Sequence, residues 1–275
     1  MRHLKTAIAA ALFLSLWTAQ AAALDLYTVV PRLTESPDAP AVQAQAAEGV
    51  CNIINSLAGD GAVSPETLDW SAAYPIHVTD ADIFSLPSYS KAAIMEAAAE
   101  YTWCYPAVIH DRPIRVTVSQ QLVPDHSLVE QGTLSEWVYQ DLLAQTGEWR
   151  APMGEIDTDQ SVAALEERLA AAGVEEGDDL ILLGGCARIR SLAAITFSDG
   201  QADQFIPLVH VRLIDAPGDM ENALQVGQAY PFAELAQQFQ SAESSQHARL
   251  WPALAAIGVC GAAALLLLWK KKHKT

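Results

Sequence analysis

The C-terminal part of the chain contains 20 consecutive residues without a charge, from Leu250 to Trp269. An α-helix of that length rises about 30 Å, the thickness of the hydrocarbon core of a bilayer. Trp251 and Trp269 lie at its two ends, where tryptophan favours the headgroup layer. The run also lacks the polar face of a soluble amphipathic helix. We therefore expect residues 250–269 to form a transmembrane helix with the lipid bilayer as its surroundings.

The alternative is a helix fully buried in a large protein core. The residues that follow argue against it, because a cluster of cations continues directly from the apolar run: Lys270, Lys271, Lys272 and Lys274. Such a cluster anchors the end of a membrane helix and is attracted to anionic lipid at about 1 kcal/mol per charge. We expect Trp251, Trp269 and Lys270–Lys272 to be the membrane-anchoring residues.

The first 23 residues have the three parts of a secretory signal peptide. Arg2 and Lys5 give a basic start, residues 7–17 are apolar, and two small-residue sites (AQA and AAA) fit the cleavage pattern. The apolar part is short for a membrane span, and it contains no Cys for lipid attachment. We expect residues 1–23 to be removed on export.

The distribution of charge predicts the orientation. Residues 24–248 hold all 33 acidic side chains but only nine Lys and Arg, a formal net charge of −24. Translocated segments lack basic residues, which stay cytoplasmic. This predicts a single-pass protein of the cell membrane, with its acidic domain outside and the tail 270–275 inside. The charge also disfavours nucleic acid as a partner.

None of the three Asn begins an N-x-[ST] sequon, which favours a bacterial envelope.

The region between the signal peptide and the membrane span is expected to be one extracytoplasmic α+β domain, residues 24–240, followed by a polar stalk at 241–249. Apolar spacing predicts helices at 42–57, 90–102, 133–144, 160–173 and 232–240. Apolar alternation and continuous apolar runs predict strands at 74–80, 107–110, 114–119 and 178–185, and a hairpin around the turn SDGQAD. With little regular β-α alternation, this predicts a mainly antiparallel sheet packed with several helices. A division into two lobes near residues 147–158 is the alternative.

Local signals refine these elements. Residues 24–40 contain several prolines and are expected to be extended. Thr133 and Glu136 have capping-box spacing at the start of the helix expected at 133–144. Asp159 is the candidate N-cap of the helix at 160–173, and Ser90 is that of the helix at 90–102. Pro207 predicts an edge position or a bulge for its strand.

Three cysteines fall in the exported domain, Cys51, Cys104 and Cys186, whereas Cys260 lies within the expected span. At most one internal disulfide can form among the three, and the spacing does not choose the pair. The fold must therefore depend on its hydrophobic core.

The sequence LLGGCARIR offers a candidate nucleophile. Cys186 would sit at a glycine turn after a strand, with Arg188 and Arg190 lowering the pKa of its thiol. A base would have to be histidine, with His210 as the candidate and His77 and His110 as further choices. The alternative is that Cys186 is a small buried residue or half of a disulfide.

No complete metal-binding set is visible. His77, Asp80 and Asp82 are close in sequence, but the two aspartates are better explained as turn and capping residues. The acids at 157–159 and 175–179 are expected to be solvated loops. The common phosphate-binding, dinucleotide-binding, serine-hydrolase, zinc-protease and C-x-x-C motifs do not occur, so we expect no cofactor or metal.

Together these patterns predict a membrane-anchored surface protein whose acidic domain is a binding or assembly module, and not an enzyme. The alternative is an anchored extracytoplasmic hydrolase with Cys186 as its nucleophile. Gly258 and Ala262 have small-xxx-small spacing within the span, which favours self-association or a partner helix there. In that case the chain would be a subunit of a membrane complex.

Overall fold

The computed structural model describes residues 24–59, 61, 63–156, 159–213 and 224–241. The expected signal peptide, the stalk beyond residue 241, the membrane span and the basic tail lie outside these residues. Among the helices of the described ranges, none has both the length and the apolar character needed to cross a bilayer.

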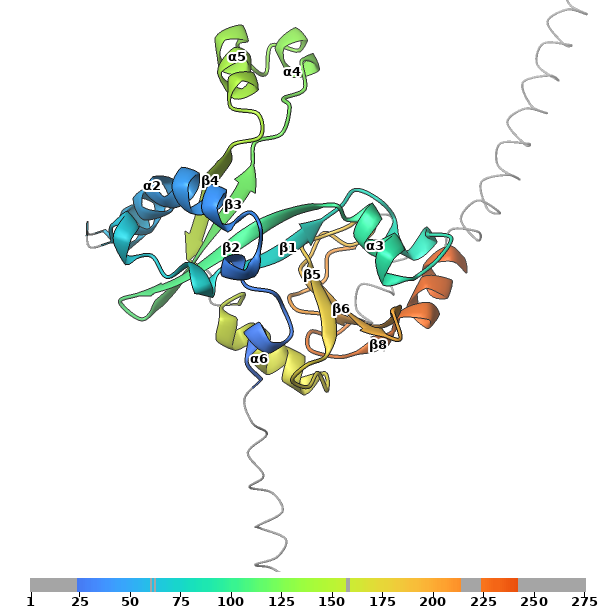
Figure 1. Cartoon of the computed structure of the whole chain (residues 1–275). Coiled ribbons are helices and arrows are strands. Elements are labelled where there is room, and N and C mark those ends of the chain that lie inside the picture. The colour runs from blue at the N-terminus through green and yellow to red at the C-terminus, as the bar shows by residue number, and fades with distance from the viewer. Residues whose placement is uncertain (1–23, 60, 62, 157–158, 214–223, 242–275) are drawn as a thin grey trace, which may run out of the picture.

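The domain is α+β, as the sequence predicts, and is built on one eight-stranded sheet with the order β4-β3-β2-β1-β5-β6-β7-β8 (Figure 1). The strands are β1 (Tyr74–Val78), β2 (Glu100–Ile109), β3 (Arg112–Gln120), β4 (Trp149–Ile156), β5 (Asp179–Leu183), β6 (Ala193–Ser198), β7 (Gln201–Pro207) and β8 (Tyr230–Pro231). The sheet is mixed, because β1 and β5 are parallel while the other neighbours are antiparallel.

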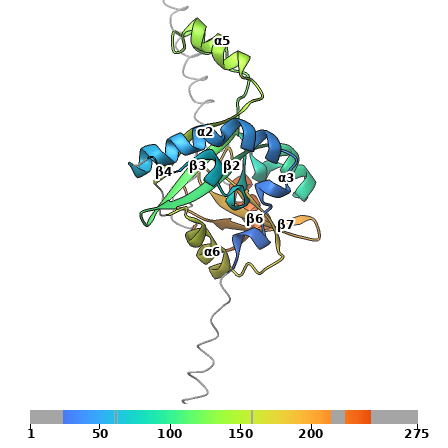
Figure 2. The same ribbon diagram turned by 60° about the vertical axis from the view of Figure 1, so that its left-hand side comes forward.

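One half of the sheet, β4-β3-β2, carries the long helix α2 (Ala39–Ala58) on one face (Figure 2). The helix confirms the predicted segment 42–57 and ends at Gly59, whose positive φ of 80° closes it. Its apolar face packs against alternate residues of β3, all buried: Ile114, Val116 and Val118. The predicted alternation of β3 is thus confirmed.

In the other half of the sheet, β5 and β6 are buried on both faces. Ile181 and Leu183 of β5 point into a cluster with Phe84, Phe205 and Phe232. Leu180 and Leu182 point the other way, into a cluster with α6 (Val162–Ala171) and the N-terminal turn η1 (Leu26–Thr28). This explains why residues 180–183 form a continuous apolar run.

Short helices close the first of these two clusters. Phe84 belongs to η5 (Ile83–Ser85), and Ile94 to α3 (Lys91–Ala97). The helix at 232–241, predicted as 232–240, adds Phe232 and Phe239, which stack on Phe84 with ring centroids 5.3 and 4.6 Å away. The predicted hairpin around SDGQAD is formed by β6 and β7, and Pro207 is the last residue of its strand.

Several local predictions were wrong. The lead-in is not extended: it forms the turns η1 and η2 (Leu33–Glu35), which bury Leu26 and Leu33. The helix predicted to reach Thr102 ends at Ala97, because residues 100–104 pair with β1. Ser90 does cap this helix, accepting a hydrogen bond from the Ala93 amide at 3.2 Å.

Two predicted caps fall on the wrong residue. Ser135, not Thr133, occupies the N-cap of α5 (Glu136–Ala144), and Ser161, not Asp159, caps α6 by accepting from the Ala164 amide. The segment considered as a lobe boundary, 147–158, instead contributes the edge strand β4.

Candidate functional site

The segment between β3 and β4 leaves the body of the domain, and we call residues 121–148 the arm. It contains α4 (Ser127–Glu130) and α5, and it stands away from the sheet at one end (Figure 1). At its base the chain continues the β3–β4 ladder: the Gln121 amide donates to the Glu148 carbonyl, and the Gly147 amide to the Gln121 carbonyl, both at 2.8 Å. The arm is therefore held to the sheet by a two-stranded stem.

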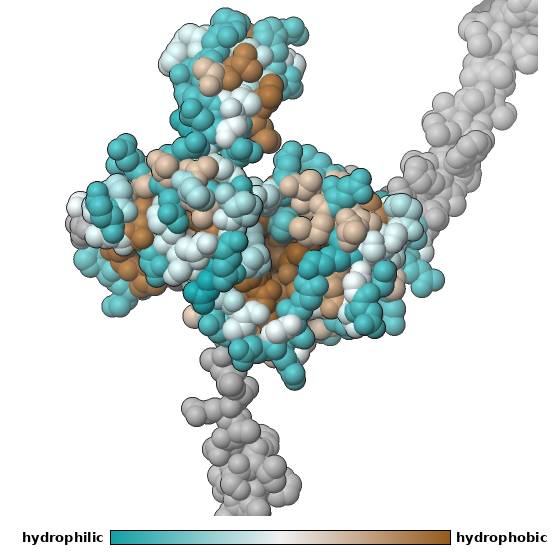
Figure 3. All heavy atoms as spheres, in the orientation of Figure 1, coloured by the Kyte–Doolittle hydropathy of each residue, from teal (hydrophilic) through white to brown (hydrophobic). Residues whose placement is uncertain are grey.

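The arm has no buried core of its own, since neither α4 nor α5 contains a buried residue. Trp137 is 73% exposed, Val123 67% and Leu122 56%, and Leu128 and Leu143 are also exposed. Apolar surface is visible on the arm among hydrophilic side chains (Figure 3). An exposed tryptophan grouped with other apolar side chains is typical of a surface that binds a partner.

A histidine joins the two helices of the arm. The two ring nitrogens of His126 lie 3.6 Å from a Glu130 carboxylate oxygen and 3.9 Å from one of Glu136. Its ring meets that of Tyr139 edge to face, with the centroids 4.9 Å apart. These contacts place the His126 side chain between α4 and α5.

The arm is also strongly acidic. Its 28 residues include five carboxylates and neither Lys nor Arg, a formal charge of −5 with histidine neutral. The carboxylates belong to Asp125, Glu130, Glu136, Asp141 and Glu148. Asp141 lies one helical turn after Trp137, on the same side of α5. The exposed apolar group is thus bordered by negative charge.

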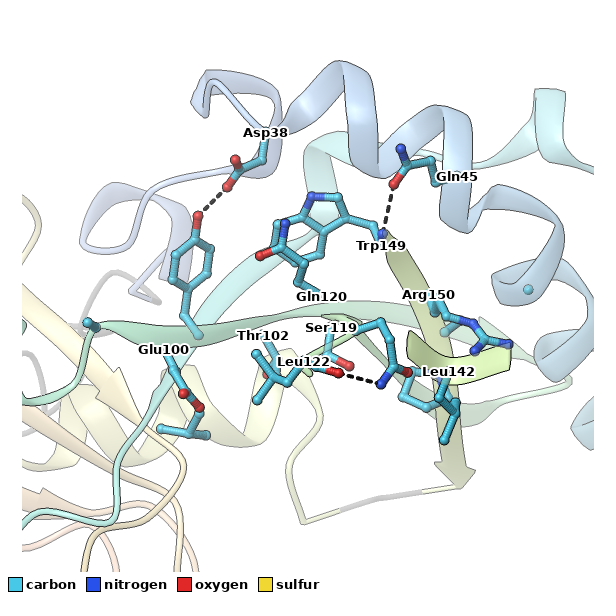
Figure 4. A pocket seen from close by; sticks show the side chains of 17 residues that line it. Asp38, Gln45, Glu100, Thr102, Ser119, Gln120, Leu122, Leu142, Trp149 and Arg150 are labelled. Carbon is cyan, nitrogen blue, oxygen red and sulfur yellow. Dashed lines mark hydrogen bonds between the residues drawn. The ribbon is translucent and has the colours of Figure 1, made fainter. Parts of the chain in front are cut away.

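A groove of about 800 Å³ opens at the base of the arm, between α2 and the strands β2 to β4 (Figure 4). Its walls include Gln45, Gln120, Trp149 and Arg150, and Leu142 reaches it from the arm. The groove therefore adjoins the exposed surface of the arm.

Hydrogen bonds hold the walls of this groove. The Tyr101 hydroxyl donates to the Asp38 carboxylate, and Gln45 accepts from the Trp149 amide at 2.7 Å (Figure 4). Burial, followed by the bond to Asp38, raises the pKa of Tyr101 to about 12. Tyr101 is therefore a neutral hydroxyl in ordinary buffers.

Cys186 lies in a different place, inside the phenylalanine-rich core below β5 and β6, and is 0% exposed. Burial raises the pKa of its thiol. Arg190 lowers it, as predicted, but by less. The Arg188 side chain points instead to Asp82, with Nε 2.7 Å from the carboxylate. The predicted thiolate therefore has no support in this geometry.

The three candidate histidines are spread over the domain. His210 is exposed beyond the end of β7, and His110 forms the β2–β3 turn with a positive φ of 50°. His77 is half-buried in β1, with Nδ1 3.1 Å from the Ala98 carbonyl oxygen. The hydrogen bonds of Cys186 are made with backbone groups at Arg188 and Ile189, and none of the three histidines takes part.

The acids near His77 have structural partners. Asp82 caps η5, accepting from the Phe84 amide, which confirms the predicted capping role, and it also binds Arg188. Asp80 lies 3.5 Å from Arg190. Among the described residues, no group of three or more acidic, histidine or cysteine side chains is arranged to hold a metal ion. Cys51, Cys104 and Cys186 are all buried.

Sequence reasoning predicted the helix of the arm but not its exposure, so it missed Trp137 and its neighbours as site residues. Comparisons with protein-family models, with curated proteins and with solved structures gave no match.

Proposed function

We propose that this chain is a single-pass, membrane-anchored surface protein whose acidic extracytoplasmic domain is an assembly module, and that the arm is the element that binds a protein partner. The anchor in this proposal is the span 250–269, and the outside position of the domain follows from its charge.

One observation carries the proposal: Trp137 is 73% exposed on a helix without a buried residue. Exposing a large aromatic ring to water costs the hydrophobic stabilisation that burial would bring, about 1.5–3 kcal/mol for a large apolar side chain. Tryptophan is also the residue type most enriched among those that dominate binding energy at protein interfaces. A partner that covers Trp137 would recover this stabilisation.

The shape of the arm supports the same function. Its two helices meet at His126, and the paired stem joins the arm to the sheet, so the apolar group has a defined point of attachment. A preorganised surface loses little conformational entropy on binding. The groove beneath it offers a place for a side chain or an extended segment of the same partner.

The alternative of a cysteine hydrolase is not favoured by any specific observation. Cys186 is enclosed by the core, and a substrate would have to displace packed side chains to reach it.

The proposal is tested with a photo-activatable residue in place of Ala144, which is exposed two turns after Trp137 in α5. Cells that make the full chain are irradiated, and adducts are compared with those from the same residue at Glu176, an exposed site remote from the arm in sequence. We expect a discrete protein adduct from position 144 alone. Equal labelling at both positions, or none at 144, would contradict the assigned role of the arm.

The anchor is tested on the same samples. Carbonate-washed membranes should retain the full chain, whereas a chain ending at residue 249 should be released into the soluble fraction. Release of the full chain would contradict the membrane part of the proposal.

A further inference from the structure

We infer that the surface bound by the arm is a basic one: a protein partner with an apolar socket for Trp137, bordered by Lys or Arg side chains that face the arm carboxylates. This inference rests on the proposed function and adds to it the chemical class of the partner.

The first step concerns the socket. Trp137, Val123 and Leu122 expose most of their side chains, and Trp137 is the largest exposed apolar side chain of α5. A large aromatic ring gains the most by entering a pocket from which water is excluded. A flat apolar surface on the partner would cover the surrounding carboxylates as well and remove their water without replacing its hydrogen bonds. Such desolvation is unfavourable for charged groups. The partner must therefore be concave at the ring and polar around it.

The second step concerns the charge of the border. The arm has five carboxylates and no Lys or Arg over 28 residues. The side chains of Glu130 and Glu136 are 72% and 60% exposed. These carboxylates would lie at the edge of the contact, where complementary charge speeds encounter and excludes wrong partners. Cationic side chains on the partner would attract the arm carboxylates, and anionic side chains would repel them.

The same charges argue against two other occupants. A second copy of this chain would bring another acidic arm, on a domain with a net charge of −24, so arm-to-arm contact is electrostatically unfavourable. An anionic lipid surface would be repelled for the same reason. A basic protein surface is the occupant that the charges favour.

The test uses the full chain in isolated membranes and a water-soluble carbodiimide, which joins a carboxylate to a lysine amine only where the two are in contact. We expect peptides containing Glu130, Glu136 or Asp141 joined to lysines of a different protein. Raising the salt from 50 to 500 mM before coupling should lower the yield about fivefold, because exposed charge pairs are screened at this ionic strength.

Two matched triple variants separate charge from fold. Glu130→Gln with Glu136→Gln and Asp141→Asn should lower the yield of partner captured from position 144 about fivefold. Glu167→Gln with Glu175→Gln and Glu176→Gln removes as much charge from exposed sites outside the arm and should leave it unchanged.

The outcomes distinguish this inference from the proposed function. If position 144 captures a partner but the arm carboxylates give no lysine adduct and no response to salt, the basic border is wrong and the assembly role stands. Adducts between two copies of this chain overturn the inference in favour of self-assembly. If neither method yields an adduct at the arm, both proposals fail.

Discussion

Gly154 of β4 lies directly against Ile53 of α2: a Cβ atom placed at residue 154 would come within 2.2 Å of Ile53 Cγ2. A Cβ at Gly49 of the same helix already comes to 3.2 Å from the Ala151 Cβ. Helix α2 therefore rests on the backbone of β4, the strand that forms one side of the stem of the arm. The close approach of Gly154 and Ile53 is one of the contacts that hold α2 on β4.

Replacing this glycine tests the contact. Gly154→Ala should lower the free energy of unfolding by about 1–3 kcal/mol, because a methyl group forced into a packed interface displaces the helix or the side chain. Gly61→Ala is the control, since nothing lies within 4 Å of a Cβ at that position, and it should change stability by less than about 0.5 kcal/mol. Denaturant unfolding of the α+β domain measures both. Equal effects would show that α2 does not sit this close to β4.

The two tryptophans near the stem should behave in opposite ways. Trp137→Ala should leave the free energy of unfolding within about 0.5 kcal/mol of the original, because the ring is exposed. Trp149→Ala should lower it by about 3–5 kcal/mol, because that ring is 6% exposed and packs near Tyr101 with centroids 6.1 Å apart. Thermal and denaturant unfolding decide the comparison. A large loss of stability for Trp137→Ala would mean that the ring packs within the domain.

Thiol labelling tests whether Cys186 is buried and unreactive. Cys51, Cys104 and Cys186 are buried, and burial raises the pKa of Cys186, so none should react with a maleimide in the folded domain. A cysteine introduced by W137C should react within minutes and provides the positive control. Labelling of Cys186 at a comparable rate, measured by mass spectrometry, would reopen the hydrolase reading.

His77 predicts a particular pH dependence. Burial lowers its pKa, while the hydrogen bond to the Ala98 carbonyl opposes the shift. Below its unfolded pKa of about 6.5 the unfolded chain takes up a proton more readily than the folded one, so this residue makes stability fall as pH falls through that value. The fall between pH 7.5 and 5.5 should be smaller in His77→Gln. An unchanged slope in His77→Gln would refute the assignment.

Much of the secondary structure could be predicted from patterns that are local. Helix α2, the β2–β3 hairpin, the buried strand β5 and the β6–β7 hairpin each carry their period within a few residues. The end of α3 could not be predicted, because the alanine-rich sequence after Ser90 favours helix while residues 100–104 are drawn into β2 by pairing with β1. Tertiary pairing overrode local propensity there.

Strand β4 was missed for a different reason. Its sequence WRAPMGEI contains Pro152 and Gly154, which usually argue against a strand. The proline is tolerated because β4 is at the edge of the sheet, and the glycine is required by the approach of Ile53. Neither cause is visible without the packing partner.

The candidate site could be predicted only in part. The sequence predicts a helix at 133–144, but apolar residues at helical spacing normally mark a face turned to the core. That Trp137 and Leu143 face solvent depends on the arm standing clear of the sheet, which is a property of the whole fold. The cysteine and the histidines singled out in the sequence lie apart because their positions, too, depend on the whole fold.

The most direct measurement of the central claim is photo-crosslinking from position 144 in the full chain, with and without Trp137→Ala. We expect the adduct to a separate protein to decrease about tenfold or more on loss of the ring, because aromatic anchors at interfaces contribute at least about 2 kcal/mol, while the unfolding curve stays unchanged. An adduct of undiminished yield in the Trp137→Ala chain would contradict the claim that this arm is the binding element.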